Sequence, residues 1–315
     1  MTSDSGGRDH VYVSVVIPTF NSAAFLARTV AELEEFLKDQ VRDYEVVIVD
    51  DGSSDNTWER VLALRLQYPS VRGVRLLRNS GQHSAVLAGL RETVGDRVVV
   101  MDDDGQHPPQ EICTLLLAAN QGHDLVFGLP EDRKHNRIRN MGSATINWLT
   151  TPVFGKPRSV HIASFKLMTR DVVDRICQFA STDPYINGEA LLFSGSPATV
   201  LVEHRARQSG KSNYNPTRLF RLVLRILIGY STFPLRFASV LGLLAGALGL
   251  VYGIFILVRA LILGTGVPGW TTLVVLVSFM QSIILLGVAF VGEYSARSLR
   301  QAQSHPAYIV VEQAE

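Results

Sequence analysis

The sequence predicts an α/β fold built on a mostly parallel sheet and followed by membrane-associated helices. Two observations lead to this prediction. Short β-branched runs alternate with segments of helical periodicity through roughly the first 130 residues, an alternation typical of a parallel sheet covered on both faces. Beyond Arg236, residues 237–258 carry no charge, and this run is long enough to cross a hydrocarbon core of about 30 Å.

The elements of the sheet domain are predicted one by one along the chain. Apolar, β-branched runs predict strands at 11–17, 45–49, 73–77, 97–101 and 125–127. Helices are expected at 23–37, from Asp55 to about residue 66, at 83–93, and from Pro108 to about residue 120. The first helix has its apolar residues on one face, and Asp55 and Pro108 are residues typical of helix starts. Further on, we expect a helix at 139–150 and an extended segment at 165–168.

Three consecutive carboxylates, Asp102, Asp103 and Asp104, follow the fourth predicted strand. Side chains alternate along an extended backbone, so Asp102 and Asp104 should share one side. Open α/β sheets bind their ligands at the carboxyl ends of strands, and two adjacent carboxylates favour a hard cation such as Mg²⁺ or Mn²⁺. Gln106 adds a neutral oxygen to this candidate metal site. The alternative is an acidic turn that only ends a strand.

Two further strands end in polar residues, at 18–21 (PTFN) and 49–55 (VDDGSSD). If the strands are parallel, these residues share an edge with Asp102, where carboxylates can bind a ribose or a base. The alternative for Asp50 and Asp51 is turn formation before Gly52, because Asp-Gly is a common turn pair. No GxGxxG motif follows the first strand, which argues against a dinucleotide-dependent oxidoreductase.

A basic cluster lies at residues 204–212, ahead of a predicted amphipathic helix. Its SGKS sequence is not a phosphate loop, because Arg205 stands where that motif needs glycine. A basic cluster beside a membrane suggests a site for an anionic lipid head group; the alternative is a solvated positive patch. The arginines at 218, 221 and 225 share one helical face, as in interfacial helices, although a helix packed on the domain is also compatible.

Two membrane spans are predicted in the last third of the chain. The uncharged run 237–258 is followed by a second, 260–292, with a Gly/Pro turn at 264–270. Basic residues before the first span and after the second predict that both ends lie in the cytoplasm. The alternative is a buried core hairpin. The N-terminal ten residues lack an apolar signal region, and the net charge of +1 argues against a nucleic-acid partner. Cys113 and Cys177 have no metal-site spacing.

Together these motifs resemble the polyisoprenyl-phosphate glycosyltransferases of glycosyltransferase family 2, which include dolichol-phosphate mannose synthases and bacterial undecaprenyl-phosphate enzymes. The resemblance covers residues 11–311 and rests on PTFN, VDDGSSDNT, RNSGQHSAVLAGL, MDDDGQHPP, FKLMTR, RARQSGKSNY, PLRFASVLG and GEYSARSLRQAQSHPAYIV. It implies a Rossmann-like GT-A domain at 11–214, after a disordered segment 1–10. Juxtamembrane amphipathic helices at 215–235, a transmembrane hairpin at 236–292 and a cytoplasmic tail at 293–315 would follow, in a multi-pass protein of the cytoplasmic membrane.

The resemblance also implies roles for individual residues. It implies Asp102, Asp104 and Gln106 as metal ligands and Asp102, Asp104, Arg205 and Lys211 as catalytic residues. Donor contacts would come from Pro18, Thr19, Asn21, Asp50, Asp51, Asn79, Gly81, His83, Asp102 and Asp103. The acceptor phosphate would be bound by Arg133, Arg139, Arg205, Arg207, Lys211 and Ser212.

One position departs from the family pattern. Many relatives have an aspartate, sometimes proposed as a base, just before a Phe-Arg-Leu stretch, whereas here Ser164 precedes Phe165. A phosphate monoester is already mostly dianionic at pH 7, because its second pKa is near 6. The acceptor therefore needs no base to become a nucleophile.

The predicted function is inverting transfer of one sugar from a nucleotide-sugar, which we expect to be a UDP-sugar, to undecaprenyl phosphate. The product would donate sugar for cell-envelope glycan modification. Alternatives are a GDP-mannose-dependent mannose synthase, a processive polysaccharide synthase and a non-catalytic membrane scaffold. A processive synthase usually has a QxxRW-type motif and more spans, and neither is found. The identity of the sugar and the formation of a homo-oligomer are left open.

Overall fold

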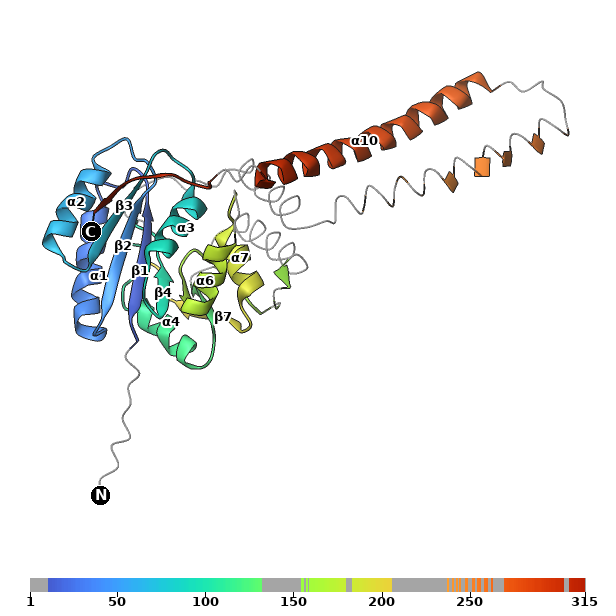
Figure 1. The fold of residues 1–315 in the computed structure, drawn as a ribbon. Helices are drawn as coiled ribbons and strands as arrows, with labels where there is room; N and C mark the ends of the chain where they lie inside the picture. The colour runs from blue at the N-terminus through green and yellow to red at the C-terminus, as the bar shows by residue number, and fades with distance from the viewer. Residues whose placement is uncertain are drawn as a thin grey trace. The chain divides into compact units, whose positions relative to one another are not determined.

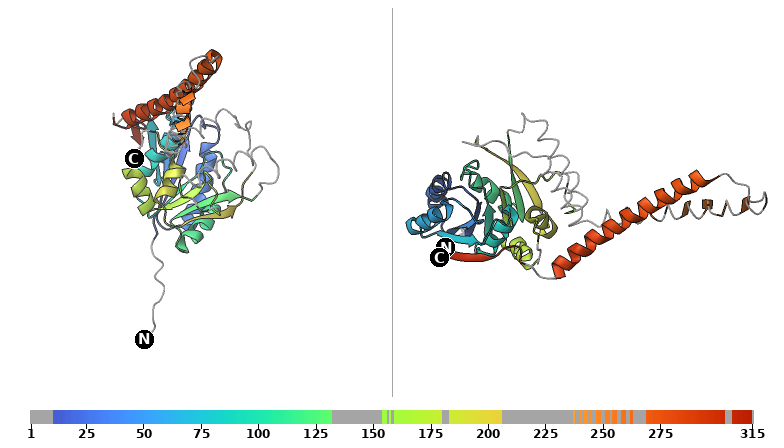
Figure 2. Two further views of the ribbon diagram at one scale, coloured as in Figure 1. Left: turned by 90° about the vertical axis from the view of Figure 1, so that its right-hand side faces the viewer. Right: turned by 90° about the horizontal axis from the view of Figure 1, so that it is seen from above.

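The computed structural model describes residues 11–131, 159–179, 183–205, 269–302 and 306–314, with isolated positions at 154–157 and 237–262. The chain divides into two compact units. The first comprises Met1–Asn215 with His305–Glu315, and the second Pro216–Ser304. Figures 1 and 2 show the fold of each unit.

The first unit is built on a sheet with strand order β7-β5-β6-β4-β1-β2-β3-β8 among the described residues. At its centre β4, β1, β2 and β3 are parallel, which confirms the predicted mostly parallel sheet. β6 runs antiparallel to both β4 and β5, and β8 antiparallel to β3. The strand bounds are Val13–Thr19 (β1), Tyr44–Asp50 (β2), Val71–Leu76 (β3), Arg97–Val100 (β4), Leu125–Pro130 (β5), Lys166–Thr169 (β6), Pro197–Val202 (β7) and Val310–Ala314 (β8).

The four predicted helices of residues 11–131 are confirmed, with shifted ends. They are α1 (Leu26–Gln40), α2 (Thr57–Gln67), α3 (Gln82–Glu92) and α4 (Glu111–Asn120). The first begins three residues later than predicted, because residues 23–25 form a turn closed by bonds to the Ser22 carbonyl. Likewise α4 follows a turn at Pro108, whose carbonyl accepts the Glu111 N–H. Sequence reasoning did not predict α6 (Arg170–Gln178), α7 (Ile186–Phe193), β7 or β8.

Helices cover both faces of the sheet (Figure 1). On one face, apolar residues of α1, α2 and α4 form a single core with alternate residues of the central strands, such as Val15 and Ile48. On the other face, α3 packs against β1 and β2. Gly89 allows this close approach, since a Cβ there would come within 2.4 Å of Val16. Between these layers β1 is buried throughout and β2 from its second residue on, as parallel strands usually are.

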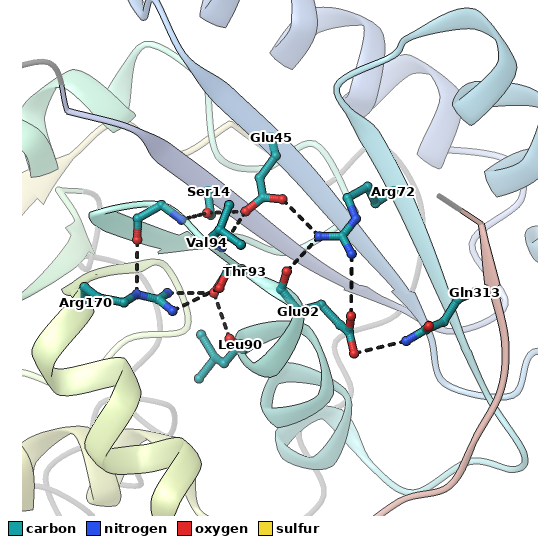
Figure 3. A network of polar contacts seen from close by, with 10 residues as sticks. Ser14, Glu45, Arg72, Leu90, Glu92, Thr93, Val94, Arg170 and Gln313 are labelled. Atoms are coloured by element: carbon teal, nitrogen blue, oxygen red, sulfur yellow. Dashed lines mark hydrogen bonds and ion pairs between the residues drawn. The ribbon is translucent and has the colours of Figure 1, made fainter.

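A polar network crosses the amino-terminal edge of the sheet (Figure 3). The buried carboxylate of Glu45 accepts hydrogen bonds from Ser14 Oγ (2.7 Å) and from Arg72 (3.3 Å). Arg72 also donates to the carbonyl of Glu92 (2.8 Å), at the end of α3. Arg170, at the start of α6, donates to the carbonyl of Thr93 (2.9 Å). Buried charges are stable when paired in this way, and the network joins strands to helices at the edge where β1, β2 and β3 begin.

The C-terminal segment, predicted as a cytoplasmic tail at 293–315, contributes a strand to the sheet. Residues 310–314 form β8, which pairs with β3. Tyr308, just before β8, accepts a hydrogen bond from Arg91 of α3 (3.1 Å), and the two side chains also form a cation–π contact. Gln313 donates to Glu92 (3.1 Å). Pairing with β8 satisfies the backbone groups of β3, which would otherwise be an exposed edge.

The second unit contains α10, Trp270–Ala302. Among the described residues, this is the one helix long and apolar enough to cross a membrane, over Phe279–Ala296. It overlaps the second predicted span. The first predicted span, the juxtamembrane segment 215–235 and the predicted helix 139–150 lie largely or wholly outside the described residues.

Candidate active site

A cavity of about 410 Å³ opens beside the carboxyl ends of β1, β2 and β4. It is lined by Pro18, Thr19, Phe20, Ser22, Asp51, Asn79, Gly81, Gln82, Ala85, Asp102, Asp103 and Asp104. Eight of these residues were predicted as donor or metal contacts. Sequence reasoning missed Phe20, Ser22, Gln82 and Ala85, although the first two lie within or beside the PTFN motif. The parallel strands β1, β2 and β4 thus bring the predicted polar segments to one edge of the sheet, as expected.

The loop after β1 is tied to the loop after β2 through Asn21. This residue has a positive φ of 53°, a backbone conformation that asparagine tolerates better than most residues. Its side-chain oxygen accepts the N–H of Ser54 (2.9 Å), and its own N–H donates to Ser53 Oγ (2.9 Å). Asn21 is not among the described residues that line the cavity, so its observed role is to hold the two loops together.

The paired aspartates after β2 have different surroundings. Asp50 is fully buried, accepts the N–H of Ser53 (3.0 Å) and lies 3.6 Å from the guanidinium of Arg75. It has the turn-forming role considered as the alternative, and the described cavity lining does not include it. Asp51 does line the cavity and accepts the N–H groups of Ser80 (2.7 Å) and Gly81 (2.9 Å). The Asp51 carboxylate therefore positions the loop ahead of α3.

The electrostatics of Asp51 are set by opposing effects. Burial raises the pKa of its carboxyl above the ordinary value, and the charge of Asp50 acts in the same direction. The two backbone N–H donors lower the pKa, but the net effect is a raised pKa. Each oxygen of this carboxylate accepts one backbone N–H and keeps further acceptor capacity for a ligand group.

The acidic loop does not continue the geometry of β4, which ends at Val100. Asp103, Asp104 and Gly105 form a turn, so the alternation expected of a strand does not govern them. Alternation would place only Asp102 and Asp104 on one side, whereas all three aspartates line the cavity. Thr29 of α1 donates to the Asp103 carbonyl (3.0 Å), which fixes the turn against α1. Burial raises the pKa of the Asp103 carboxyl, opposed by the hydroxyls of Ser22 and Thr19.

Asp102 is held by two neutral donors. Gln82 Nε2 donates to its Oδ1 (2.8 Å), and Ser164 Oγ donates to its Oδ2 (2.7 Å). Ser164 is the residue that departs from the family pattern, and the structure places its hydroxyl on a candidate metal ligand. Asp104 has another arrangement, since its Oδ1 accepts the N–H of Gln106 (3.1 Å).

A buried histidine, His107, lies beside the acidic loop. The ring of His107 stacks on Phe165 with centroids 4.7 Å apart and meets His204 edge-on at 5.0 Å. Its Nε2 lies 3.9 Å from Asp102 Oδ2, too far for a hydrogen bond. Burial lowers the pKa of His107, and the charge of Asp102 opposes this. His83, predicted as a donor contact, packs instead against Tyr185, with ring centroids 5.1 Å apart, and is outside the described cavity lining.

The oxygen donors fit a divalent cation that shares its coordination with a ligand. Asp102 and Asp104 line one cavity, and the side chain of Asp102 is 28% exposed. Within the described part of the chain, no three His, Cys, Asp or Glu side chains gather as a complete metal site. Mg²⁺ is often bound by one or two carboxylates together with substrate phosphates. Asp102 and Asp104, two carboxylates open to a cavity, match that pattern. Gln106, the third predicted ligand, follows Asp104 by two residues and is outside the described cavity lining.

The basic cluster is described only at its beginning. Arg205 Nη1 forms an ion pair with Glu32 of α1 at 2.6 Å, and the Arg205 N–H donates to the Gln106 carbonyl (2.9 Å). The Arg205 side chain lines a second cavity, of about 530 Å³, together with Arg28 and Glu35 of α1. The other predicted acceptor residues, Arg133, Arg139, Arg207, Lys211 and Ser212, lie outside the described residues.

Comparison with known proteins decides the family. The model of glycosyl transferase family 2 matches residues 14–177, a range that includes every described wall of the 410 Å³ cavity. The chain belongs to glycosyl transferase family 2. It is a glycosyltransferase, in agreement with the resemblance drawn from its motifs.

The curated relatives are similar over nearly the whole chain. An undecaprenyl-phosphate 4-deoxy-4-formamido-L-arabinose transferase of Edwardsiella ictaluri is 33% identical over 310 residues, covering 95% of this chain and 93% of the relative. A protein of the same name from Aeromonas hydrophila is 31% identical over 303 residues, with 95% and 92% covered. These relatives are polyisoprenyl-phosphate glycosyltransferases, the group that the motifs of the sequence resemble.

Solved structures share the fold of the catalytic unit. Glucosyl-3-phosphoglycerate synthase of Mycobacterium tuberculosis, in complex with Mn²⁺, UDP and phosphoglyceric acid, matches with a TM-score of 0.51 and 20% identity, over 69% of this chain and 76% of that one. Mannosyl-3-phosphoglycerate synthase of Rubrobacter xylanophilus matches with a TM-score of 0.51 and 17% identity, over 69% and 72%. At this identity the likeness shows the GT-A fold alone.

Proposed function

We propose that the protein transfers a single sugar from a UDP-sugar to a polyisoprenyl phosphate, undecaprenyl phosphate, at the cytoplasmic face of the membrane. The observation that carries this proposal is the cavity in which Asp51, Asp102 and Asp104 meet at the carboxyl edge of β1, β2 and β4. The polyprenyl acceptor is supported by the names of relatives at 30% identity and above. A Mn²⁺- and UDP-bound enzyme of the same fold supports a UDP donor.

In this proposal the donor lies along the cavity. The nucleoside is placed by the loops after β1 and β2, with Asp51 and Asn79 beside it. The diphosphate lies over Asp102 and Asp104, which would hold Mg²⁺ or Mn²⁺ with Gln106 as a third oxygen. The cation would supply positive charge to the departing diphosphate. Asp103, which lines the same cavity, is assigned to the donor contacts and not to the metal.

The reaction is a single displacement. An oxygen of the acceptor phosphate attacks C1 of the sugar, a C1–O bond forms, and the C1–O bond to the diphosphate breaks with release of UDP. One displacement inverts the anomeric centre. The acceptor arrives mostly dianionic at pH 7, so the chain's task is to hold it in line behind C1. Arg205, Arg207, Lys211 and Ser212, with Arg133 and Arg139, are proposed to bind its phosphate.

The proposed membrane topology follows from the sequence and α10. Two spans within 236–292 would anchor the protein, with the catalytic unit and both termini in the cytoplasm, because basic residues flank both outer ends. Such an anchor keeps the catalytic unit beside a lipid acceptor. The lipid-linked sugar would then serve glycan modification of the cell envelope.

The deciding experiment is a transfer assay on the full-length protein in membranes, with undecaprenyl phosphate, Mn²⁺ and a panel of UDP- and GDP-sugars. We expect a monoglycosylated lipid with one UDP-sugar. Asp104→Ala should abolish transfer, while Asp43→Ala, at an exposed aspartate ahead of β2, should retain it. A polymeric product would support a processive synthase, transfer from GDP-mannose alone would support a mannose synthase, and donor binding without turnover would support a scaffold.

A further inference from the structure

We propose that Ser164 and Gln82 are positioning residues that fix the carboxylate of Asp102 for a divalent cation. The inference rests on the proposed function, in which Asp102 is a metal ligand. Its basis is that each oxygen of the Asp102 carboxylate accepts one hydrogen bond, Oδ1 from Gln82 (2.8 Å) and Oδ2 from Ser164 (2.7 Å). The sequence suggested neither contact, since the three residues lie far apart along the chain.

The first step concerns the freedom of Asp102 itself. β4 ends at Val100, so the hydrogen bonds between strands do not extend to residue 102. Its side chain is 28% exposed, and a carboxylate in a loop can rotate about both side-chain bonds. Donors on both oxygens restrict that rotation to one plane. A metal ligand fixed in advance loses less conformational entropy when the ion binds.

The second step concerns the two donors, which both come from anchored backbone. Gln82 is the first residue of α3 and follows Gly81, whose N–H is bound by Asp51 (2.9 Å). Ser164 precedes the fully buried Phe165, and its carbonyl accepts a hydrogen bond from the Lys166 ammonium (3.2 Å). The hydroxyl and the amide are therefore held where they are, and they fix the orientation of the carboxylate.

The third step concerns charge. A serine hydroxyl and a glutamine amide are neutral donors, and each occupies only part of the acceptor capacity of its oxygen. Lone pairs on both Asp102 oxygens are left for a cation. A carboxylate at position 164 would instead place a like charge beside Asp102 and raise the pKa of one of the two. At position 164 the chain instead has a serine, whose hydroxyl supports Asp102 as a metal ligand. The acceptor phosphate needs no general base at this position.

The expected fall in Mn²⁺ affinity can be judged from other residues that support metal ligands. Their removal usually costs 10- to 100-fold in metal affinity or activity. Ser164→Ala removes the hydroxyl with little change in volume, so we expect Mn²⁺ affinity to fall roughly 10-fold, with a similar fall for Gln82→Met. Ser164→Thr keeps a hydroxyl and should bind Mn²⁺ nearly as well as the wild type.

The test is Mn²⁺ titration of the full-length protein in detergent with UDP present, followed by the electron paramagnetic resonance signal of free Mn²⁺. Ser159→Ala, an exposed serine five residues earlier, is the matched control. UDP binding in the presence of EDTA is a second readout, and it should be equal in wild type and Ser164→Ala. A purely structural role for Ser164 would lower both affinities together.

The outcomes separate this inference from the proposed function. Unchanged Mn²⁺ affinity in both Ser164→Ala and Gln82→Met, with affinity lost in Asp104→Ala, would overturn the inference and leave the metal site in place. Wild-type protein that binds no Mn²⁺ with UDP would overturn both. If Ser164→Ala does not fold, as judged by circular dichroism, Gln82→Met decides the question, because Gln82 makes its contact from the first turn of α3.

Discussion

Arg205 and Glu32 form an ion pair at 2.6 Å that holds the chain after β7 against α1. The backbone N–H of Arg205 also donates to the carbonyl of Gln106 (2.9 Å), in the acidic loop. Arg205, the first arginine of the basic cluster, is therefore held at two points, one on a helix and one beside the candidate metal ligands. Glu32 also pairs with Arg28 (2.8 Å), and hydrogen bonds from Arg28 and Arg205 lower the pKa of its carboxyl.

Glu32→Gln should weaken the use of the lipid acceptor. The substitution removes the charge that fixes Arg205, and a partly exposed ion pair is worth up to about 1 kcal/mol, so we expect KM for undecaprenyl phosphate to rise roughly two- to fivefold. KM for the donor should not change. Steady-state kinetics with each substrate varied would test this, with Glu59→Gln, at an exposed glutamate of α2, as control. A lower acceptor KM would show instead that Glu32 competes with the phosphate for Arg205.

Asp51→Asn should impair donor binding. The carboxylate accepts the N–H groups of Ser80 and Gly81 with one oxygen each, whereas an amide offers only one acceptor. One backbone donor would lose its partner, at about 1 to 3 kcal/mol, and the loop ahead of α3 would lose its position. We expect UDP affinity to fall roughly 10-fold or more by calorimetry. As a control, Asp39→Asn, exposed on α1, should bind UDP as the wild type does. Wild-type UDP affinity in Asp51→Asn would contradict the prediction and show that other contacts fix the loop.

Lys166→Met should change how stability depends on pH. Burial lowers the pKa of the Lys166 ammonium to about 8, although the charge of Asp102 opposes this effect. The unfolded chain keeps the ordinary value of 10.5, so it binds more protons between pH 8 and 10.5, and wild-type stability should rise across this window by about 3 kcal/mol. Below pH 8 the variant should be more stable than the wild type, because it no longer buries a charged ammonium at position 166.

The measurement for Lys166→Met is urea unfolding of the full-length protein at several values from pH 7 to pH 10. The difference in unfolding free energy between wild type and variant should shrink as pH rises. Lys38→Met, an exposed lysine of α1, corrects for general effects of charge removal. A constant difference across the range would show that Lys166 titrates near its ordinary pKa.

Removal of β8 should expose the edge of β3. The strand pairs with β3, and Tyr308 binds Arg91 of α3. A shortened chain that ends at residue 305 should exchange the amide hydrogens of β3 faster and should self-associate, because an unpaired strand edge is a template for pairing. Hydrogen exchange and light scattering would test this. Tyr308→Phe keeps the ring but loses the hydroxyl and should show a much smaller effect, whereas unchanged exchange in the shortened chain would contradict the prediction.

The sequence determined the elements whose signal is local. The apolar face of α1, the β-branched runs of β1 to β4 and the polar residues that follow these strands were all predictable, because side-chain periodicity depends on residues a few positions apart. The position of Asp51 and of Asp102 to Asp104 at one sheet edge followed from parallel strands. Exact ends were less predictable: Pro108 signalled a helix start, but α4 begins at Glu111 after a turn.

The tertiary structure alone decided the contacts between distant segments. Ser164 reaches Asp102 across 62 positions, β6 enters the sheet antiparallel between β4 and β5, and β8 returns from the C-terminus to β3. It also separated Asp50, turned toward Arg75, from Asp51 in the cavity. Backbone hydrogen bonding is nearly independent of side-chain identity, so local patterns predict a strand but not its partner. Which polar residues meet at the cavity therefore depends on how the whole chain packs.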